Sequence, residues 1–353
     1  MDKDTTLEKL LSLDAPPERV EELMEMIDVD LPDVSEDVKR FLLKQQVEMF
    51  QLEYGRYALR TQVSDALVDQ LLEDGIDTHV HGASDPFERL QFEDEIGIEC
   101  TRARMKAVVI KTWYTPSASR NGLVQRLVDR WADEHGLRPT LLYGGITLNT
   151  SVGGLNPDAV RKCLGFPRFK YVWMPMADSY YHQLVVFRRK NAGIHFLDAS
   201  GKLVPTMEEI LRIIADNDLV LACGHYPYRD AAVLMEGAKR LGVRRMEIVH
   251  PTLVHSKHTI AQMKNMAREG VKIGLMGIAS VNVRFLEGIR WYFRTIRELS
   301  DHMILGSDAG QVQNPRHVDG LRWLIKVLLA YGITPEEITK IFKTNPAGHL
   351  GLA

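Results

Sequence analysis

Eight short, apolar runs rich in β-branched residues recur between residue 75 and the end of the chain, and amphipathic segments of helical spacing separate them. Strands that alternate with helices form parallel sheets, and eight such units in 279 residues match the size of a (β/α)8 TIM barrel. A doubly wound sheet is the rival fold, but no GxGxxG follows the first run. We therefore expect an α/β protein with a barrel over residues 75–353. The runs lie at 75–81, 106–113, 140–149, 169–176, 219–225, 245–251, 271–277 and 302–310.

Residues 1–74 differ in character from the rest of the chain. They have helical spacing and no strand signal, and they carry 19 acidic against 8 basic residues, a net charge of −11. The remaining 36 basic and 28 acidic residues give residues 75–353 a net charge of +8. We expect a helical N-terminal extension beside a mildly basic barrel. Its aromatic residues Phe50, Tyr54 and Tyr57 favour contact with a second copy, which predicts a homo-oligomer.

The interval between the fourth and fifth runs is the longest in the barrel region. It contains Ala199-Ser200-Gly201 between two short apolar stretches, which is typical of a hairpin turn. We predict a hairpin insertion near residues 180–205, placed to cover the mouth of the barrel.

Composition argues against several classes of protein. The net charge of −3 disfavours a general nucleic-acid binder, which would need a clearly basic surface. No apolar run reaches the roughly 18 residues that span a bilayer, and the N-terminus lacks the pattern of a secretory signal. The widely spaced Cys100, Cys163 and Cys223 form neither a disulfide framework nor a CxxC metal site. We therefore expect a cytoplasmic protein that acts on a small molecule, without nucleic-acid or membrane partners.

Metal-binding residue types stand at the ends of the predicted strands, where barrels keep their active sites. The first run ends in His79-Val80-His81, and residues two apart in a strand point to the same face. Both imidazoles should therefore face the barrel axis, with Asp77 beneath them on the same face as an orienting partner.

Three further residues of this kind close later runs: His225 the fifth, His250 the sixth and Asp308 the eighth. Four histidines and one carboxylate at one barrel end suit a divalent cation. Zn²⁺ is the first expectation, and Mn²⁺ or Fe²⁺ would accept the same ligands.

The HVH triplet at 79–81, His225, His250 and Asp308 within GSDAG together resemble the metal-binding pattern of the amidohydrolase superfamily. The resemblance covers roughly residues 75–353. More narrowly, the chain is similar to an uncharacterised amidohydrolase-like group, through Lys111 in VVIKTWY, the loop at 153–157 and the Gly-His pair that ends at His225. The resemblance implies a metal-dependent barrel hydrolase and gives no substrate.

One departure from the superfamily pattern concerns the number of ions. Many two-metal members carry a bridging lysine or glutamate at the end of the fourth strand, whereas this strand ends Trp-Met-Pro-Met at 173–176. Lys111, at the end of the second run, has three open roles: a carbamylated bridge, a cationic anchor for a substrate anion, or a structural ion pair. One ion and two ions both stay open.

These residues predict a hydrolase that cleaves an amide, lactone, ester or cyclic C–N bond in a small molecule. The molecule is expected to be an anion if Lys111 is its cationic anchor. Asp308 is the expected general base, and His250 would bind a second ion or stabilise the oxyanion. A divalent ion lowers the pKa of bound water from 15.7 to about 7. Loop residues expected to contact the substrate are Arg120, His182, Tyr226 and His255.

Two alternatives compete with hydrolysis. A single-metal site with a cationic Lys111 or Arg120 would suit a decarboxylase of an aromatic or unsaturated acid. A barrel that keeps its histidines for structure could instead be a binding or assembly protein, although the complete ligand set with Asp308 weighs against this.

Overall fold

The computed structural model describes residues 63–352 apart from 253–255, 257, 278–288 and 313. Eight parallel strands form one sheet in the order β1-β2-β3-β4-β5-β6-β7-β8. The strands are β1 (Ile76–His81), β2 (Ala107–Lys111), β3 (Leu141–Thr147), β4 (Phe169–Trp173), β5 (Val220–Cys223), β6 (Arg245–Val249), β7 (Lys272–Met276) and β8 (Met303–Gly306).

The segment after β8 closes the sheet onto β1. Val80 and Ala309 form a parallel bridge, and the His81 amide donates to the Ala309 carbonyl at 2.9 Å. The Asp308 amide donates to the His79 carbonyl at 2.8 Å. The predicted (β/α)8 barrel is therefore confirmed, with all eight runs forming strands.

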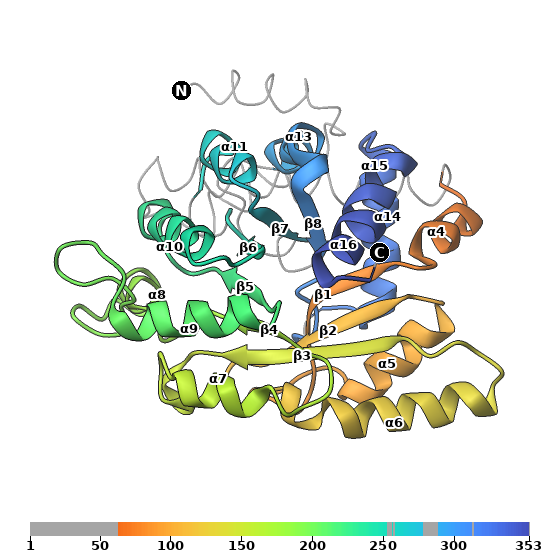
Figure 1. The fold of residues 1–353 in the computed structure, drawn as a ribbon. Coiled ribbons are helices and arrows are strands. Elements are labelled where there is room, and N and C mark those ends of the chain that lie inside the picture. Colours follow the sequence, from red (N-terminus) through yellow and green to blue (C-terminus); the bar gives the residue numbers. More distant parts are fainter. Residues whose placement is uncertain (1–62, 253–255, 257, 278–288, 313, 353) are drawn as a thin grey trace, which may run out of the picture.

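Helices surround the strands (Figure 1). The outer layer follows the strands in chain order as α5, α6, α7, α9, α10, α11, α13 and α14. The helices are α4 (Asp65–Leu72), α5 (Glu93–Arg102), α6 (Ala118–Glu134), η1 (Thr150–Val152), α7 (Pro157–Cys163), α8 (Tyr180–Val185), α9 (Pro205–Asp216), α10 (Tyr228–Arg240), α11 (Ile260–Arg268), α13 (Ile289–Leu299), η2 (Ser300–His302), α14 (His317–Ala330), α15 (Pro335–Thr339), η3 (Lys340–Thr344) and α16 (Asn345–Leu350).

Two apolar clusters reflect the alternation of side chains along each strand. The larger cluster fills the space between strands and helices. The smaller one fills the barrel interior around Tyr171 and Trp173, and Ala347 and Leu350 of α16 join it. The closing helix therefore packs against the interior, which leaves the opposite end of the barrel for the pocket.

An irregularity in β1 reverses the predicted direction of Asp77. The pairing with β2 shifts register between Asp77 and Val80. Asp77 then bonds to His317 of α14, with its Oδ2 2.8 Å from His317 Nε2, while its Oδ1 accepts from the His79 amide at 3.0 Å. The expectation that Asp77 lies on the inner face and orients the imidazole of His79 or His81 is wrong, because the extra residue changes the strand's alternation and Asp77 contacts His317 instead.

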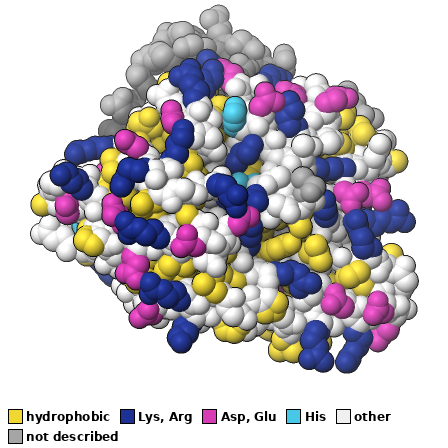
Figure 2. Space-filling model, in the orientation of Figure 1, with side chains coloured by type: hydrophobic (Ala, Val, Ile, Leu, Met, Phe, Trp, Pro, Cys, Tyr) yellow, Lys and Arg dark blue, Asp and Glu magenta, His cyan; other side chains and the backbone are white. Residues whose placement is uncertain are grey.

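The predicted extension lies mostly outside the described residues, since the description begins at residue 63 and contains α4. Around the Ala199-Ser200-Gly201 turn, Leu197 and Leu203 form an antiparallel bridge. Basic and acidic side chains are interspersed over the face in Figure 2. Within the described part of the chain, no helix is both long and apolar enough to cross a bilayer.

Ion pairs tie β4, β5 and β6 together at the end of the barrel remote from the pocket. Asp218, two residues before β5, accepts from Arg245 and Arg244 at 2.9 Å each, and Lys170 lies 3.3 Å away. The Arg245 guanidinium is the main cause that lowers the pKa of Asp218 to about 2.

We expect Asp218→Asn to destabilise the protein by about 1 kcal/mol near pH 7, a value reduced for the partial solvent exposure of the site. Because folding lowers the pKa of this carboxyl, its contribution is present above the ordinary value of 3.8 and is lost as the pH falls through about 2. Asparagine tolerates the left-handed backbone at this position, where φ is 51°. Denaturant unfolding from pH 7 to pH 2 tests this, and a difference that stays constant across that range contradicts it.

Candidate metal centre

His79, His81 and Asp308 converge at the C-terminal end of the barrel. The two histidines end β1, and Asp308 follows β8 by two residues. Asp308 Oδ1 lies 3.4 Å from His79 Nε2 and 3.1 Å from His81 Nε2, and one ligand atom from each residue lies within 4.8 Å of the others. All three residues are buried.

The chemistry of this group fits a divalent cation. Burial, with the Lys111 ammonium as the second cause, lowers the pKa of His79 well below its ordinary value, and burial does the same for His81. Neutral imidazoles and a carboxylate are the donors that zinc-type ions bind. Among the described residues, no other group of three or more His, Cys, Asp or Glu side chains meets the same distance criterion.

The backbone is in the left-handed region at three of the predicted ligands. The φ angle is 62° at His225, 36° at His250 and 51° at Asp308. Such conformations cost non-glycine residues about 1–3 kcal/mol and are concentrated at functional sites. Gly310 is also constrained, because a Cβ there would lie 2.2 Å from the His81 carbonyl oxygen.

His225 and His250 extend the cluster beyond the three-residue group. Their ring centroids are 4.7 Å apart, and the His250 centroid lies 5.9 Å from that of His79. His182 of α8 brings its Nδ1 to 2.7 Å from His225 Nδ1. Burial lowers the pKa of His182 to about 4, so the His182 ring is neutral at neutral pH. The structure therefore brings all five predicted histidines of the described chain to one site.

Lys111 lies at the floor of the site. Its Nζ is 3.1 Å from His79 Nε2, and its side chain is buried. Burial lowers the pKa of Lys111 to about 8, and the Asp308 carboxylate opposes this shift. Lys111 also lines the pocket, and its three expected roles stay open.

The cluster opens into a pocket of about 460 Å³. Aromatic rings form one wall: the centroids of Phe87 and Trp113 are 5.5 Å apart, and those of His182 and Phe187 are 5.0 Å apart. The pocket is lined by His81, Phe87, Glu88, Arg89, Lys111, Trp113, His182, Phe187, His225, His250, Asp308, Gln311 and Val312.

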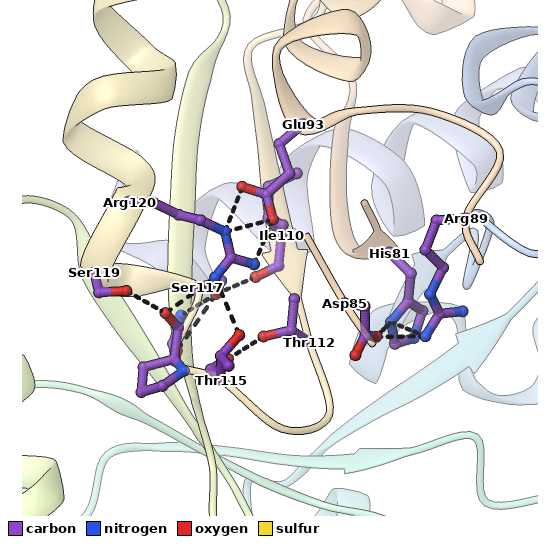
Figure 3. A network of polar contacts seen from close by, with 12 residues as sticks. His81, Asp85, Arg89, Glu93, Ile110, Thr112, Thr115, Ser117, Ser119 and Arg120 are labelled. Carbon is purple, nitrogen blue, oxygen red and sulfur yellow. Dashed lines mark hydrogen bonds and ion pairs between the residues drawn. The ribbon is translucent and has the colours of Figure 1, made fainter. Parts of the chain in front are cut away.

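Two residues expected to contact substrate lie elsewhere. Arg120 donates from Nε and Nη2 to Glu93, at 2.9 Å and 2.6 Å, and Figure 3 shows this pair apart from the cluster of His81. Tyr226 is buried and donates its hydroxyl to the Ile194 carbonyl at 2.9 Å. Neither residue lines the pocket. The guanidinium of Arg120 is bound to Glu93, and the hydroxyl of Tyr226 is bound to the Ile194 carbonyl. His255 falls outside the described residues.

The loop between β1 and α5 supplies pocket residues that sequence reasoning missed. Arg89 donates from Nη2 to Asp85 Oδ2 at 2.6 Å, and the same nitrogen lies 3.3 Å from His81 Nδ1 (Figure 3). The available signal was an acidic residue four positions before an arginine, in the loop that follows the two metal-type histidines.

Comparison with solved structures finds proteins of similar fold. An amidohydrolase from Pseudomonas aeruginosa superposes with a TM-score of 0.55 at 15% identity, over 82% of this chain and 98% of that chain. An amidohydrolase from Burkholderia multivorans with bound zinc has a TM-score of 0.48 at 13% identity, over 79% and 99%. The first superposition shows that the barrel shares the fold of an amidohydrolase, the fold that the resemblance in the sequence implies.

The family assignment is narrower. A family of unknown function, DUF6282, matches residues 74–274, so the chain belongs to that family. No curated protein matches the chain.

The left-handed backbone at His225 predicts an unusual order of stabilities. Ser179 Oγ donates to the His225 carbonyl at 2.9 Å and holds this conformation. We expect His225→Gly to be more stable than His225→Ala by about 1 kcal/mol, because only glycine adopts positive φ without steric cost.

Chemical denaturation with a chelator present measures this difference without any contribution from metal. Ala222→Gly, in the regular part of β5, is the control and should lower stability. Equal stability of the two His225 variants would contradict the argument.

Proposed function

We propose that the protein is a metal-dependent hydrolase that cleaves an amide, lactone, ester or cyclic C–N bond of a small molecule. The observation that supports this most is the convergence of His79, His81 and Asp308 at the floor of a pocket at the C-terminal end of the barrel. His79, His81 and Asp308 would hold one divalent ion. Zinc is the first candidate because of the histidine-rich donor set.

A bound divalent cation would supply Lewis acidity, which lowers the pKa of water and polarises the group under attack. Asp308 is the carboxylate at the pocket floor, and it would take a proton from the attacking water and return it to the leaving group. His250 lines the same pocket and would donate a hydrogen bond to the developing oxyanion, or join His225 at a second ion.

A second candidate reaction is decarboxylation of an unsaturated or aromatic acid. Two cationic side chains, Arg89 and Lys111, line the pocket together with aromatic residues, an arrangement that would hold an aromatic carboxylate. Assays of both reactions on the same preparations separate the candidates, since decarboxylation releases carbon dioxide and hydrolysis does not.

We expect protein purified without chelator or histidine tag to hold at least one divalent ion per chain by elemental analysis. His79→Ala and Asp308→Asn should each lower metal affinity at least about tenfold, because each removes a ligand from a three-residue group. His135→Ala changes an exposed histidine that follows α6 and stacks on Trp131, so it is the matched control and should retain the metal.

Metal content that is unchanged in both ligand variants would contradict the proposed site. Lys111→Ala in the same series counts the ions: a fall from two equivalents to one identifies a bridging lysine. A single equivalent that persists assigns Lys111 to the substrate.

A further inference from the structure

The loop that carries Arg89 is held rigidly at the mouth of the pocket. Arg89 and Gln311 form an antiparallel bridge, and the Leu90 amide donates to the Gly310 carbonyl at 3.0 Å. At the base of the loop, the Ala83 amide donates to the Gln91 carbonyl at 2.8 Å. The backbone on both sides of Arg89 is therefore fixed, so its side chain is placed before any ligand arrives.

Arg89 uses its hydrogen-bond donors incompletely. Its side chain is only 6% exposed, and Nη2 donates to Asp85 Oδ2 at 2.6 Å. Its Nε is buried and makes no hydrogen bond with the described chain. Arg120 differs, since it directs both Nε and Nη2 to Glu93, as Figure 3 shows for the two arginines. A buried guanidinium with an unused donor is suited to an anionic acceptor.

The residues around Arg89 indicate that its ligand also carries an apolar group. Phe87 and Val312 line the pocket and yet are 45% and 48% exposed. The Phe87 ring meets Trp113 edge-on at 5.5 Å, and the Arg89 guanidinium carbon lies 5.8 Å from the Phe87 ring centroid. Exposed aromatic surface beside a buried cation matches a ligand that carries an apolar planar group next to its charge.

We propose that Arg89 anchors a carboxylate of the substrate, and that an aromatic or other planar apolar part of the same molecule lies against Phe87 and Trp113. This inference rests on the proposed function, because it takes the pocket beside the metal centre to be the one that binds the substrate. It narrows the substrate class to small carboxylates with a planar apolar group. Asp85 then serves as the positioning residue that orients Arg89.

Metal binding at His81 would favour this role of Arg89. His81 Nε2 faces Asp308 and is the atom available to a cation, so the ring proton would then reside on Nδ1. A protonated Nδ1 cannot accept from Arg89, and the nearby Asp85 Oδ2, 3.9 Å from it, is beyond hydrogen-bond distance. Arg89 Nη2 would thereby lose an acceptor within the protein and gain capacity for the ligand.

Calorimetric titration with benzoate and with benzamide tests the anchor. The two probes share size and ring but differ in charge, so their affinity ratio reports the carboxylate contact. We expect wild type to prefer benzoate and Arg89→Gln to lose about 10- to 100-fold in benzoate affinity, with benzamide affinity unchanged. Phe87→Ala should weaken both probes equally and leave the ratio as in wild type.

Arg245→Gln is the matched control, because it breaks an Arg–Asp ion pair at the opposite end of the barrel. It should lower stability without changing either affinity. An unchanged benzoate preference in Arg89→Gln overturns the proposal, and so does equal loss of both probes with loss of metal, which would assign Arg89 to the support of His81. Protein that holds no divalent ion when purified without chelator, and yet shows Arg89-dependent benzoate binding, would count against the metal-dependent hydrolase and leave the anchor standing.

Discussion

The hydrogen-bonded seam between β1 and the segment after β8 is the constraint on which the site depends. The Asp308 amide bonds to the His79 carbonyl, and the His81 amide bonds to the Ala309 carbonyl. The same contacts that close the barrel therefore place the carboxylate that follows the last strand beside two imidazoles of the first strand. The hydrogen bonds that close the barrel therefore also set the geometry of the metal ligands. A shift of one residue in the pairing between β1 and the segment after β8 would break the closure and separate the ligands.

The irregularity in β1 contributes to this arrangement through Asp77. Its Oδ1 accepts from the amides of His79 and Ser307, each at 3.0 Å, so one carboxylate oxygen bridges the two strands beneath the ligands. His317 Nδ1 lies 3.4 Å from Cys100 Sγ, which links this carboxylate to α5 and α14. Asp77 thus supports the ligands through the backbone, while the imidazole that its side chain contacts is that of His317.

Sequence reasoning succeeded where the governing interactions are local and failed where they are not. Strand periodicity is local, and it was sufficient to predict the eight strands and to bring His79 and His81 to one end of the barrel. The directions of Arg120 and Tyr226 are set by Glu93 and Ile194, partners 27 and 32 residues away. Pairings between residues so far apart produce no periodic pattern in the sequence. The same holds for the bridge between Arg89 and Gln311, which positions the Arg89 loop.

The left-handed residues explain how the strand ends aim their side chains. In a strand that continued regularly, successive side chains would alternate between the pocket and the helices. Positive φ at His225, His250 and Asp308 breaks that alternation just where β5, β6 and β8 end. The side chain of each residue is thereby directed across the mouth of the barrel, and all three side chains line the same pocket. The backbone strain is therefore the local cost of directing separate strands to one point, and the barrel closure supports it.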